Sequence, residues 1–471
     1  MAVFNFIKLS ELEGAKRLDA EYYKPEYLKV KQKLLQTEFV YFKDLVEEII
    51  HPKEIKREYE EEKQDYLFLL AQNVRSLMLD LSEKKFISEE IAKLMPKNLL
   101  EKGDILFIRT GAVGDSTVYT GEPPKVIASA HILIAKPNFR VSPYYLAVFF
   151  NTSFGKNLII RGTYGALQPE IAPNYIKNLP VSIFSRDLII KIEKLFLKSQ
   201  DLLQESQNLY SQAEDLLLEE LGLKDFKPKY EKTYTAKLSD AFSAHRIDAE
   251  YFQPAYEEVI KLLMKKVKVE KLKNVVSFIS HGKQPYYVEN GDIPVLIQKH
   301  LGSQLLSLYS EIVNMPDTPR TDREFVKKYP EYLIKPFDVL FYSVGAYLGR
   351  ANVVLENFEA VPASFITLIR TKQEVCNPVY LALFLNSKIG QLQSSRWKSA
   401  SAQQYIYPKE IKEFIIPILP LSIQQEIASL VQQSHEARKK AKELLELAKR
   451  AVEIAIEEGE EKAINFLSRI K

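Results

Sequence analysis

The stretch RLDAEYYKPEY at residues 17–27 recurs 229 positions later as RIDAEYFQPAY at residues 246–256. Two further pairs follow in the same order. GDILF at residues 103–107 matches FDVLF at residues 337–341, and PYYLAVFFNTS at residues 143–153 matches PVYLALFLNSK at residues 378–388, with the offset now 235. A period of this length is far too long for a solenoid unit, so the sequence predicts a duplicated domain.

Composition agrees with two globular domains. The chain has 471 residues, of which 46% are hydrophobic and 27% charged, as in ordinary folded proteins. No stretch approaches the roughly 18 unbroken apolar residues of a membrane helix, and the first residues lack the pattern of a secretory signal. The single Cys376 has no second thiol for a disulfide or a zinc site. Together these features favour a cytoplasmic protein.

The small net charge of +3 is unevenly distributed. Residues 186–222 contain four Lys or Arg and eight Asp or Glu, and residues 421–471 contain nine of each. The rest of the chain therefore carries a net charge of +7. The globular parts are therefore basic and the helices are not. This distribution is typical of domains that bind and neutralise phosphate groups. Ordinary charge variation among segments is the alternative explanation.

Within each copy the pattern predicts mixed α/β structure. Short apolar runs at residues 105–108 and 339–342 indicate buried strands, and residues 130–135 and 364–369 indicate a second strand in each copy. The segments that begin at Pro143 and Pro378 have helical spacing, with proline in the permitted first turn.

Each copy ends in a long helix whose small and apolar residues recur at alternating steps of four and three. The stripe of the first helix comprises Leu188, Ile192, Leu195, Ser199, Leu202, Ser206, Leu209, Ala213 and Leu216. The stripe of the second comprises Ile423, Ile427, Leu430, Ser434, Ala437, Ala441, Leu444, Ala448, Ala451 and Ala455. So narrow a stripe predicts a partner helix. The alternative is that each helix packs only on its own domain.

Motifs for catalysis are missing from the sequence. The six histidines have no metal-ligand spacing, and no G-x-x-x-x-G-K-[ST] phosphate loop occurs. The glycine pairs Gly111/Gly114 and Gly345/Gly349 lack the dinucleotide fingerprint. We therefore expect neither a catalytic site nor a metal site in this chain.

Several motifs in a fixed order resemble a known family, the specificity subunits of type I restriction–modification systems. They are GDIL at residues 103–106 followed by Gly111 and Gly114, GDIP at residues 291–294, and Gln403-Gln404 leading through PILPL at residues 417–421 into the last helix. The first copy is looser, because it offers only DYLFL at residues 65–69 in place of GDIP and lacks the later prolines. The resemblance covers essentially the whole chain.

This resemblance implies an α/β (α+β) fold with two target-recognition domains, separated by a pair of antiparallel coiled-coil helices and related by a pseudo-two-fold axis. The expected boundaries are 1–185 for the first domain, 186–222 for the central spacer helix, 223–236 for a linker, 237–420 for the second domain and 421–471 for the C-terminal spacer helix. The helix-pairing residues would be Leu188, Ile192, Leu195, Leu202, Leu209, Leu216, Ile423, Ile427, Leu430 and Leu444.

The resemblance also implies a function. Each domain would bind one half of a bipartite, asymmetric site in double-stranded DNA, and the chain itself would not be an enzyme. DNA methyltransferase subunits would dock on the helices and bring S-adenosylmethionine. A restriction motor-nuclease subunit would bring ATP and Mg²⁺, so this chain would hold no cofactor of its own.

Residues that contact DNA are expected on loops beside rigid strands. Arg, Lys, Asn, Gln and aromatic residues are the types expected there, together with polar residues next to them. In the first copy they are Asn73, Arg75, Arg109, Thr110, Arg161, Tyr164 and Gln168. In the second copy they are Lys283, Gln298, Lys299, Tyr342, Ser343, Arg350, Arg396, Lys398, Gln403 and Gln404. Polar loop residues are more often merely solvated, which is the alternative for each of them.

Other interpretations stay open at this point. The chain could be the specificity subunit of a related split-site nuclease-methylase, a coiled-coil scaffold that binds no DNA, or an uncharacterised two-domain enzyme. The repeated sets Arg17/Asp19/Tyr22 and Arg246/Asp248/Tyr251 would support the fold or contact a partner subunit, and the spacing of the aromatic residues favours the fold.

Overall fold

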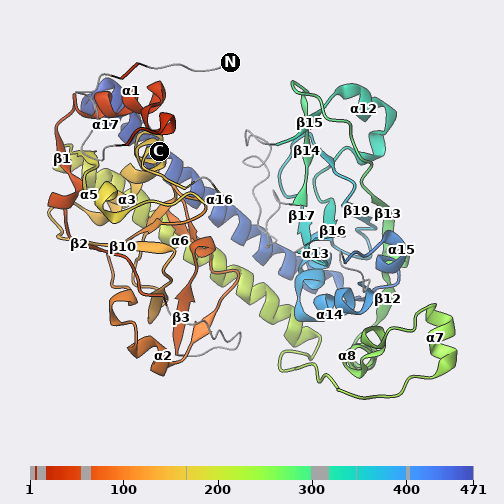
Figure 1. The fold of residues 1–471 in the computed structure, drawn as a ribbon. Helices are drawn as coiled ribbons and strands as arrows, with labels where there is room; N and C mark the ends of the chain where they lie inside the picture. Colours follow the sequence, from red (N-terminus) through yellow and green to blue (C-terminus); the bar gives the residue numbers. More distant parts are fainter. Residues whose placement is uncertain are drawn as a thin grey trace. The chain divides into compact units, whose positions relative to one another are not determined.

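A computed structural model gives the fold of the chain (Figure 1). The residues that it describes are 6–7, 17–54, 65–165, 167–298, 318–345, 347–398 and 404–469. The chain divides into two compact units, unit 1 with residues 1–203 and 440–471 and unit 2 with residues 204–439. The division falls inside two long helices, α6 (Arg186–Glu220) and α16 (Leu421–Glu458), so each unit holds one domain copy and part of both helices.

Unit 1 is built on a four-stranded antiparallel sheet in the order β2–β10–β7–β8. Its strands are β2 (Val46–Ile50), β10 (Ile132–Pro137), β7 (Ile105–Ile108) and β8 (Ser116–Val118). Alternate residues of β7 enter different cores, because successive side chains of a strand point to opposite faces. Ile105 and Phe107 share a core with helix α3 (Pro143–Asn151), whereas Leu106 and Ile108 face the smaller sheets.

The other elements of unit 1 surround this sheet. A second sheet has the order β6 (Phe86–Ile87), β3 (Tyr66–Leu69) and β9 (Val126–Ala128), with β3 and β9 parallel. Two further strand pairs are β1 (Phe39–Tyr41) with β11 (Pro180–Ser182), and β4 (Val74–Arg75) with β5 (Met78–Leu79). The short helices are α1 (Pro25–Leu34), α2 (Glu89–Lys93), α4 (Ser153–Arg161) and α5 (Pro173–Lys177).

Unit 2 repeats the four-stranded sheet, the three-stranded sheet and the β1–β11 pair of unit 1, which confirms the predicted duplication; the β4–β5 pair has no counterpart among the described residues of unit 2. Its main sheet has the order β13 (Val276–His281), β19 (Ile366–Thr371), β16 (Val339–Tyr342) and β17 (Ala351–Val353). The second sheet is β15 (Arg320–Thr321), β14 (Ile293–Leu296) and β18 (Val361–Pro362), again with one parallel pair, and β12 (Val269–Lys271) pairs with β20 (Ile415–Pro417). Its short helices are α7 (Leu238–Ala244), α8 (Pro254–Lys266), α9 (Leu272–Val275), α12 (Arg323–Lys328), α13 (Pro378–Asn386), α14 (Lys388–Trp397) and α15 (Pro408–Ile411).

Equivalent side chains make equivalent contacts in the two units. The hydroxyl of Tyr145 on α3 donates to the carbonyl oxygen of Ser182 at 2.6 Å, and that of Tyr380 on α13 donates to the carbonyl oxygen of Pro417 at 2.8 Å. Each bond ties the Pro-led helix to the strand that precedes a long helix. The predicted helix starts at Pro143 and Pro378 are both confirmed.

The repeated motif with which the sequence analysis began supports the fold. Arg17 forms two hydrogen bonds with the carboxylate of Asp19, at 2.7 and 2.6 Å, and its guanidinium also donates to the carbonyl oxygens of Gly162 and Thr163 after α4. Arg246 binds Asp248 in the same way and donates to the carbonyl oxygens at the end of α14. A cation is favourable there because the last carbonyl groups of a helix carry partial negative charge.

The two long helices pack against each other in antiparallel orientation, as predicted. In unit 1 the beginning of α6, with Leu188 and Ile192, shares a core with Ala448 near the end of α16. In unit 2 the end of α6, with Leu217, shares a core with Ile427 near the start of α16. Along both helices, each domain core is therefore completed by residues from the other half of the sequence.

The buried face of these helices differs from the predicted stripe in two ways. Leu195, Leu202, Leu209, Leu216, Leu430 and Leu444 are only partly buried, whereas Phe196, Leu217, Val431 and Leu445 are fully buried. The reason is that each helix packs on its domain as well as on its partner, so its buried face is wider than a two-helix stripe. The second helix also does not continue to residue 471, because Gly459, with φ +102°, separates α16 from α17 (Glu460–Ser468).

Within the described part of the chain, no helix carries an apolar stretch long enough to cross a membrane.

Candidate nucleic-acid interface

The first loop cluster lies where β7 ends, and comprises residues 109–114, 163–165 and 167–171. Backbone hydrogen bonds join its two segments, from the amide of Ile171 to the carbonyl oxygen of Arg109 at 3.0 Å and from the amide of Gly111 to that of Pro169 at 3.1 Å. The cluster is therefore a pair of loops held together beside a rigid sheet, which is where base-contacting residues are expected.

An ion pair occupies the middle of the first loop cluster. The guanidinium Nη2 of Arg109 lies 2.7 Å from Oε2 of Glu170, and the side chains are 19% and 29% exposed. The hydroxyl of Tyr164 donates to the same carboxylate oxygen at 3.3 Å. Arg109 keeps further N–H groups for a ligand, because a guanidinium has five donors and Glu170 receives one bond from it here. Bidentate binding of guanine is the commonest specific contact of arginine with DNA.

His51, which follows β2, lies within electrostatic range of this ion pair and is exposed. Burial of part of the ring lowers the pKa of His51, and the charge of Arg109 lowers the same pKa further. The imidazole is thus kept neutral near neutral pH, and so can act as both donor and acceptor. The sequence analysis missed this residue, although His51 and His281 recur at an offset of 230.

The second loop cluster, at the equivalent place in unit 2, comprises His281 and residues 343–345 and 404–407. His281 stacks on the ring of Tyr407, with ring centroids 5.6 Å apart, and Tyr405 packs against Tyr407. Nδ1 of His281 lies 3.1 Å from the carbonyl oxygen of Ser364. The amide of Ile406 donates to the carbonyl oxygen of Ser343 at 2.9 Å, which repeats the bond between Ile171 and Arg109.

That repeated bond fixes the correspondence between the two clusters. Arg109 is equivalent to Ser343 and Glu170 to Tyr405, so the ion pair of the first cluster has no counterpart in the second. Tyr342 is the last residue of β16, is 1% exposed and corresponds to Ile108.

Five predicted DNA contacts are buried, and we assign them instead to the support of the fold. Arg161 is 3% exposed, its Nε donates to the carbonyl oxygen of Tyr22, and its guanidinium lies 4.0 Å from the Tyr22 ring centroid. Asn73 binds three backbone groups, at Leu70, Asp80 and Glu83. The others are Thr110, Tyr342 and Ser343, and the hydroxyl of Ser343 is paired with Thr367.

The remaining predicted residues are spread over both units. Arg75, Tyr164, Gln168, Lys283 and Gln404 are exposed. Lys398, which ends α14, is partly buried. Oε1 of Gln298 lies 2.7 Å from the place of a Cβ on Gly345, so Gln298 packs against the second loop cluster. Arg350 lies within electrostatic range of Glu214 on α6. Burial raises the pKa of Glu214, and the positive charge of Arg350 partly offsets this increase. Lys299 and Gln403 lie outside the described residues.

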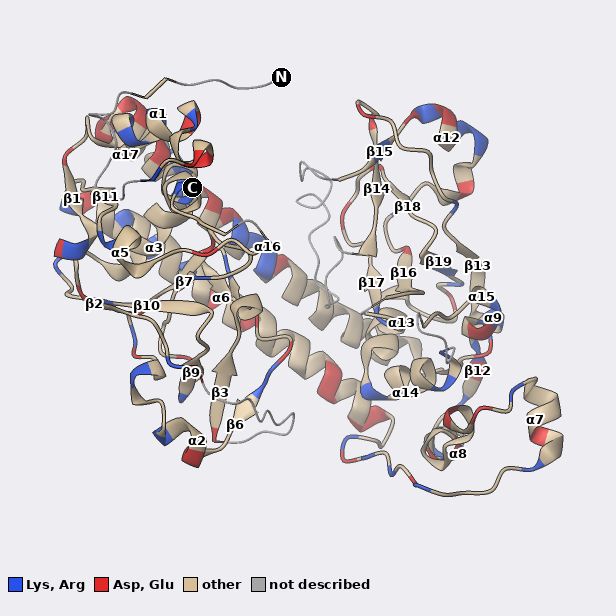
Figure 2. Cartoon of the chain, in the orientation of Figure 1, with Lys and Arg blue, Asp and Glu red and all other residues tan. Residues whose placement is uncertain are grey.

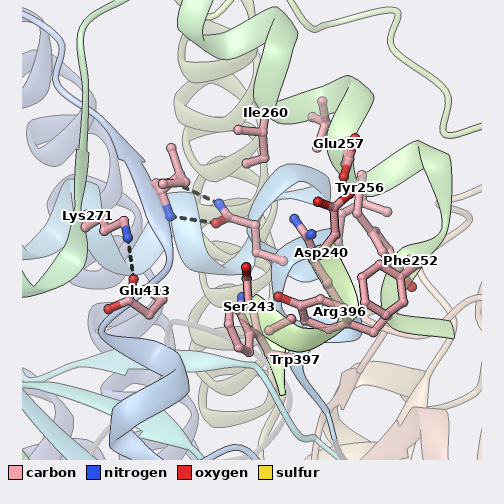
Figure 3. Close-up of a pocket in the computed structure, with 16 residues that line it drawn as sticks. Asp240, Ser243, Phe252, Tyr256, Glu257, Ile260, Lys271, Arg396, Trp397 and Glu413 are labelled. Atoms are coloured by element: carbon pink, nitrogen blue, oxygen red, sulfur yellow. Dashed lines mark hydrogen bonds and ion pairs between the residues drawn. The ribbon is translucent and has the colours of Figure 1, made fainter. Parts of the chain in front are cut away.

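A pocket of about 540 Å³ in unit 2 lies beside α7, α8 and α14 (Figure 3). Arg396 lines it, with its guanidinium 4.6 Å from the ring centroid of Tyr251, and Trp397 packs against the same ring. Arg396 is thus placed like Arg161, on the tyrosine of the repeated motif. An ion pair between Lys271 and Glu413 closes another side of the pocket.

The described residues contain no group of three or more side chains that could hold a metal ion. Burial raises the pKa of the Cys376 thiol to about 12, so this sulfur is not a reactive thiolate. The long helix α6 is acidic, as its composition indicated. Figure 2 shows acidic residues near its C-terminal end, where Glu214, Asp215, Glu219 and Glu220 lie.

Comparisons with known proteins found one matching family model and several similar solved structures. Residues 264–447 match the family model described as Type I restriction modification DNA specificity domain. No curated protein matches the sequence significantly. Among solved structures, the chain is similar to the S subunit of a type I restriction-modification system from M. genitalium, with 11% identity and a TM-score of 0.41, over 92% of this chain and 96% of that one. It is also similar to an HsdS subunit from Thermoanaerobacter tengcongensis, with 16% identity and a TM-score of 0.28, over 90% and 97% of the two chains.

Proposed function

From the premise that residues 264–447 form a type I restriction modification DNA specificity domain, we propose that the whole chain is a DNA sequence-specificity subunit with two such domains. Each domain binds one half of a bipartite site. The first half of the chain takes part because unit 1 has a four-stranded and a three-stranded sheet with the same strand orders as those of unit 2.

One observation carries the proposal in detail: the two loop clusters share a backbone frame and differ in side-chain chemistry. Arg109 and Glu170 in the first cluster correspond to Ser343 and Tyr405 in the second. The first cluster presents an arginine with an acidic neighbour, whereas the second presents His281 and two tyrosines, Tyr405 and Tyr407, and these side chains offer different hydrogen bonds to base edges. The two half-sites therefore differ in sequence, and the complete site is asymmetric.

Partner subunits supply the chemistry in this proposal. DNA methyltransferase subunits dock on the long helices and bring S-adenosylmethionine, and a restriction motor-nuclease subunit brings ATP and Mg²⁺. This chain is not an enzyme and acts in the cytoplasm, where a DNA-binding subunit meets its substrate. The net charge of +7 outside residues 186–222 and 421–471 supports contact of the domains with phosphates.

The test is methylome sequencing of a host that expresses the chain together with its methyltransferase. We expect methylation at an interrupted, asymmetric motif that disappears when the chain is omitted. Methylation that persists without the chain, or methyl transfer from labelled S-adenosylmethionine by the purified chain alone, would contradict the proposal.

The alternative of a scaffold that binds no DNA predicts that the chain does not shift a random duplex in a gel-shift assay. The specificity domain in residues 264–447 does not favour that alternative. A related split-site nuclease-methylase would give the same methylome and would differ in the subunits that co-purify with the chain.

A further inference from the structure

The segment that follows α4 turns back on itself, so that Tyr164 pairs with Glu170 in a narrow hairpin. Its ends are joined by two backbone hydrogen bonds, from the amide of Tyr164 to the carbonyl oxygen of Glu170 at 2.9 Å and from the amide of Glu170 to that of Tyr164 at 2.8 Å. Gly165 has φ +93°, and a Cβ there would lie 2.6 Å from the carbonyl oxygen of Gln168. The turn therefore needs glycine at this position.

The hairpin is also fixed to the loop that carries Arg109. Two backbone hydrogen bonds and the ion pair between Arg109 and Glu170 connect them, and the hydroxyl of Tyr164 binds the same carboxylate. The backbone at both ends of this turn is consequently held in place beside Arg109. Such pre-organisation lowers the entropic cost of binding a ligand.

Two neighbouring side chains at the tip are free to meet a ligand. Leu167 is fully exposed, at 102%. Gln168 is exposed, and within the described residues its side-chain amide has no hydrogen-bond partner. An apolar side chain next to a free carboxamide matches an A·T base pair in the major groove, because a carboxamide binds N6 and N7 of adenine and an apolar group contacts the C5-methyl of thymine.

We propose that Leu167 contacts the C5-methyl group of a thymine in the first half-site, and that Gln168 beside it binds adenine. This inference rests on the proposed function and adds a specificity-determining residue of apolar type. The sequence analysis had searched only for polar and aromatic contacts, and so passed over Leu167.

The experiment uses the complex of the full chain with its methyltransferase, and the site found by methylome sequencing. Each thymine of the first half-site is replaced in turn by deoxyuridine, which removes only the C5-methyl group, and Kd is measured by fluorescence anisotropy. We expect one replacement to weaken binding about 4-fold, as the loss of one buried methyl group implies. In the variant Leu167→Ala that same replacement should have little further effect.

The matched control is Phe139→Ala. Phe139 is also a large, exposed apolar residue of unit 1, at 66%, but it follows the opposite end of β10 from the strand end beside Arg109. This variant should keep the full sensitivity to deoxyuridine. Thermal melting of both variants checks folding, and because Leu167 is fully exposed we expect no change in Tm.

The outcomes separate this inference from the proposed function. If Leu167→Ala keeps the deoxyuridine sensitivity of the wild type, or if no thymine of the first half-site is sensitive, the inference is wrong although the chain still selects its site. If the wild-type complex shows no sequence preference at all, the proposed function fails and the inference fails with it.

Discussion

The hydroxyl of Ser434 on α16 donates a hydrogen bond to the backbone carbonyl oxygen of Ser206 on α6, at 2.6 Å, and the two hydroxyls lie 3.0 Å apart. Both side chains are buried, at 0% and 3% exposed. The first prediction is that Ser434→Leu lowers the free energy of unfolding by roughly 1–3 kcal/mol, because the larger side chain must push two packed helices apart. Urea denaturation measures this change.

The control for this variant is Gln432→Leu, which adds an apolar side chain at an exposed position of the same helix. Its midpoint of denaturation should stay close to that of the wild type. Equal midpoints for Ser434→Leu and the wild type would show that the helices are not packed tightly at this point.

The second prediction concerns recognition by Arg109. Arg109→Ala should weaken binding by roughly 1–3 kcal/mol, with the loss confined to one base position of the first half-site, since an arginine can bind guanine in bidentate fashion. Affinity measurements on single-base variants of the site test this. Ser343→Ala, at the equivalent position of the second copy, is the comparison and should leave the first half-site unaffected. Equal loss at both half-sites in Arg109→Ala would contradict the assignment.

The third prediction separates a phosphate contact from a base contact. Lys398→Ala should weaken binding of all DNA sequences alike and reduce the slope of log K against log salt by about 1, because lysine acts on phosphate as a point charge. Lys462→Ala on α17 removes an equal charge from a side chain that is 65% exposed and paired with Glu458, and it should leave the slope unchanged. A loss in Lys398→Ala that depends on the base sequence would make it a base contact.

The fourth prediction concerns His435 on α16 and the dependence of stability on pH. Burial lowers the pKa of His435, although Glu356, 4.0 Å away, opposes that effect. The unfolded state therefore binds a proton more readily than the folded state, so this residue destabilises the fold as pH falls below about 6.5, the ordinary value for histidine. We expect His435→Leu to lose less stability than the wild type between pH 7.5 and pH 5. Parallel curves for the two proteins would be the contrary result, and His245→Asn, at an exposed position, is the control.

The fifth prediction is that a fragment of residues 1–230 forms a dimer. In the full chain the core of unit 1 includes Ala448, Val452 and Ile456 from α16, and the core of unit 2 includes their equivalents Ala213, Leu217 and Leu221 from α6. In a fragment dimer each copy's α6 would supply those residues to the other copy, which closes a two-fold arrangement.

Two identical domains in such a dimer would bind the same bases on opposite strands. With the methyltransferase, the fragment should then direct methylation to an interrupted palindrome made of the first half-site. Sedimentation at micromolar concentration and methylome sequencing test the two parts. A monomeric fragment, or a dimer that still selects the asymmetric site, would contradict the expected pairing.

Elements with strong local signals could be predicted from the sequence. The strands around Leu106 and Leu340 and the helices that begin at Pro143 and Pro378 are confirmed, because apolar runs and helix-start residues act over a few positions. The equivalence of DYLFL at residues 65–69 with the GDIP region is confirmed as well, since β3 and β14 make the same parallel pairing, with β9 and β18 respectively.

The candidate site was less accessible to sequence reasoning, because residue type does not say which way a side chain points. Arg161 and Arg396 were expected on loops, yet they lie in the last turns of α4 and α14 and pack on Tyr22 and Tyr251 far along the chain. Glu170 was overlooked since an acid is not an obvious ligand of DNA, although it holds Arg109 in place. Leu195 and Phe196 illustrate the same limit in α6, where a heptad pattern selects the wrong one of two adjacent apolar residues.

Each unit contains part of a long helix from the other half of the chain. Because of this, unit 2 can complete its fold on the ribosome before unit 1, although unit 1 contains the N-terminus. All of unit 2 has been synthesised once residue 439 has emerged, because the part of α6 that it needs is already present. Synthesis of unit 1 begins first, but its core also needs Ala448, Val452 and Ala463, which are made after unit 2 is complete. Until then an apolar face of the N-terminal domain stays open, as exposed surface in an incomplete multidomain chain does. A premature stop codon near residue 440 would thus leave the second domain complete and deprive the first domain of part of its core.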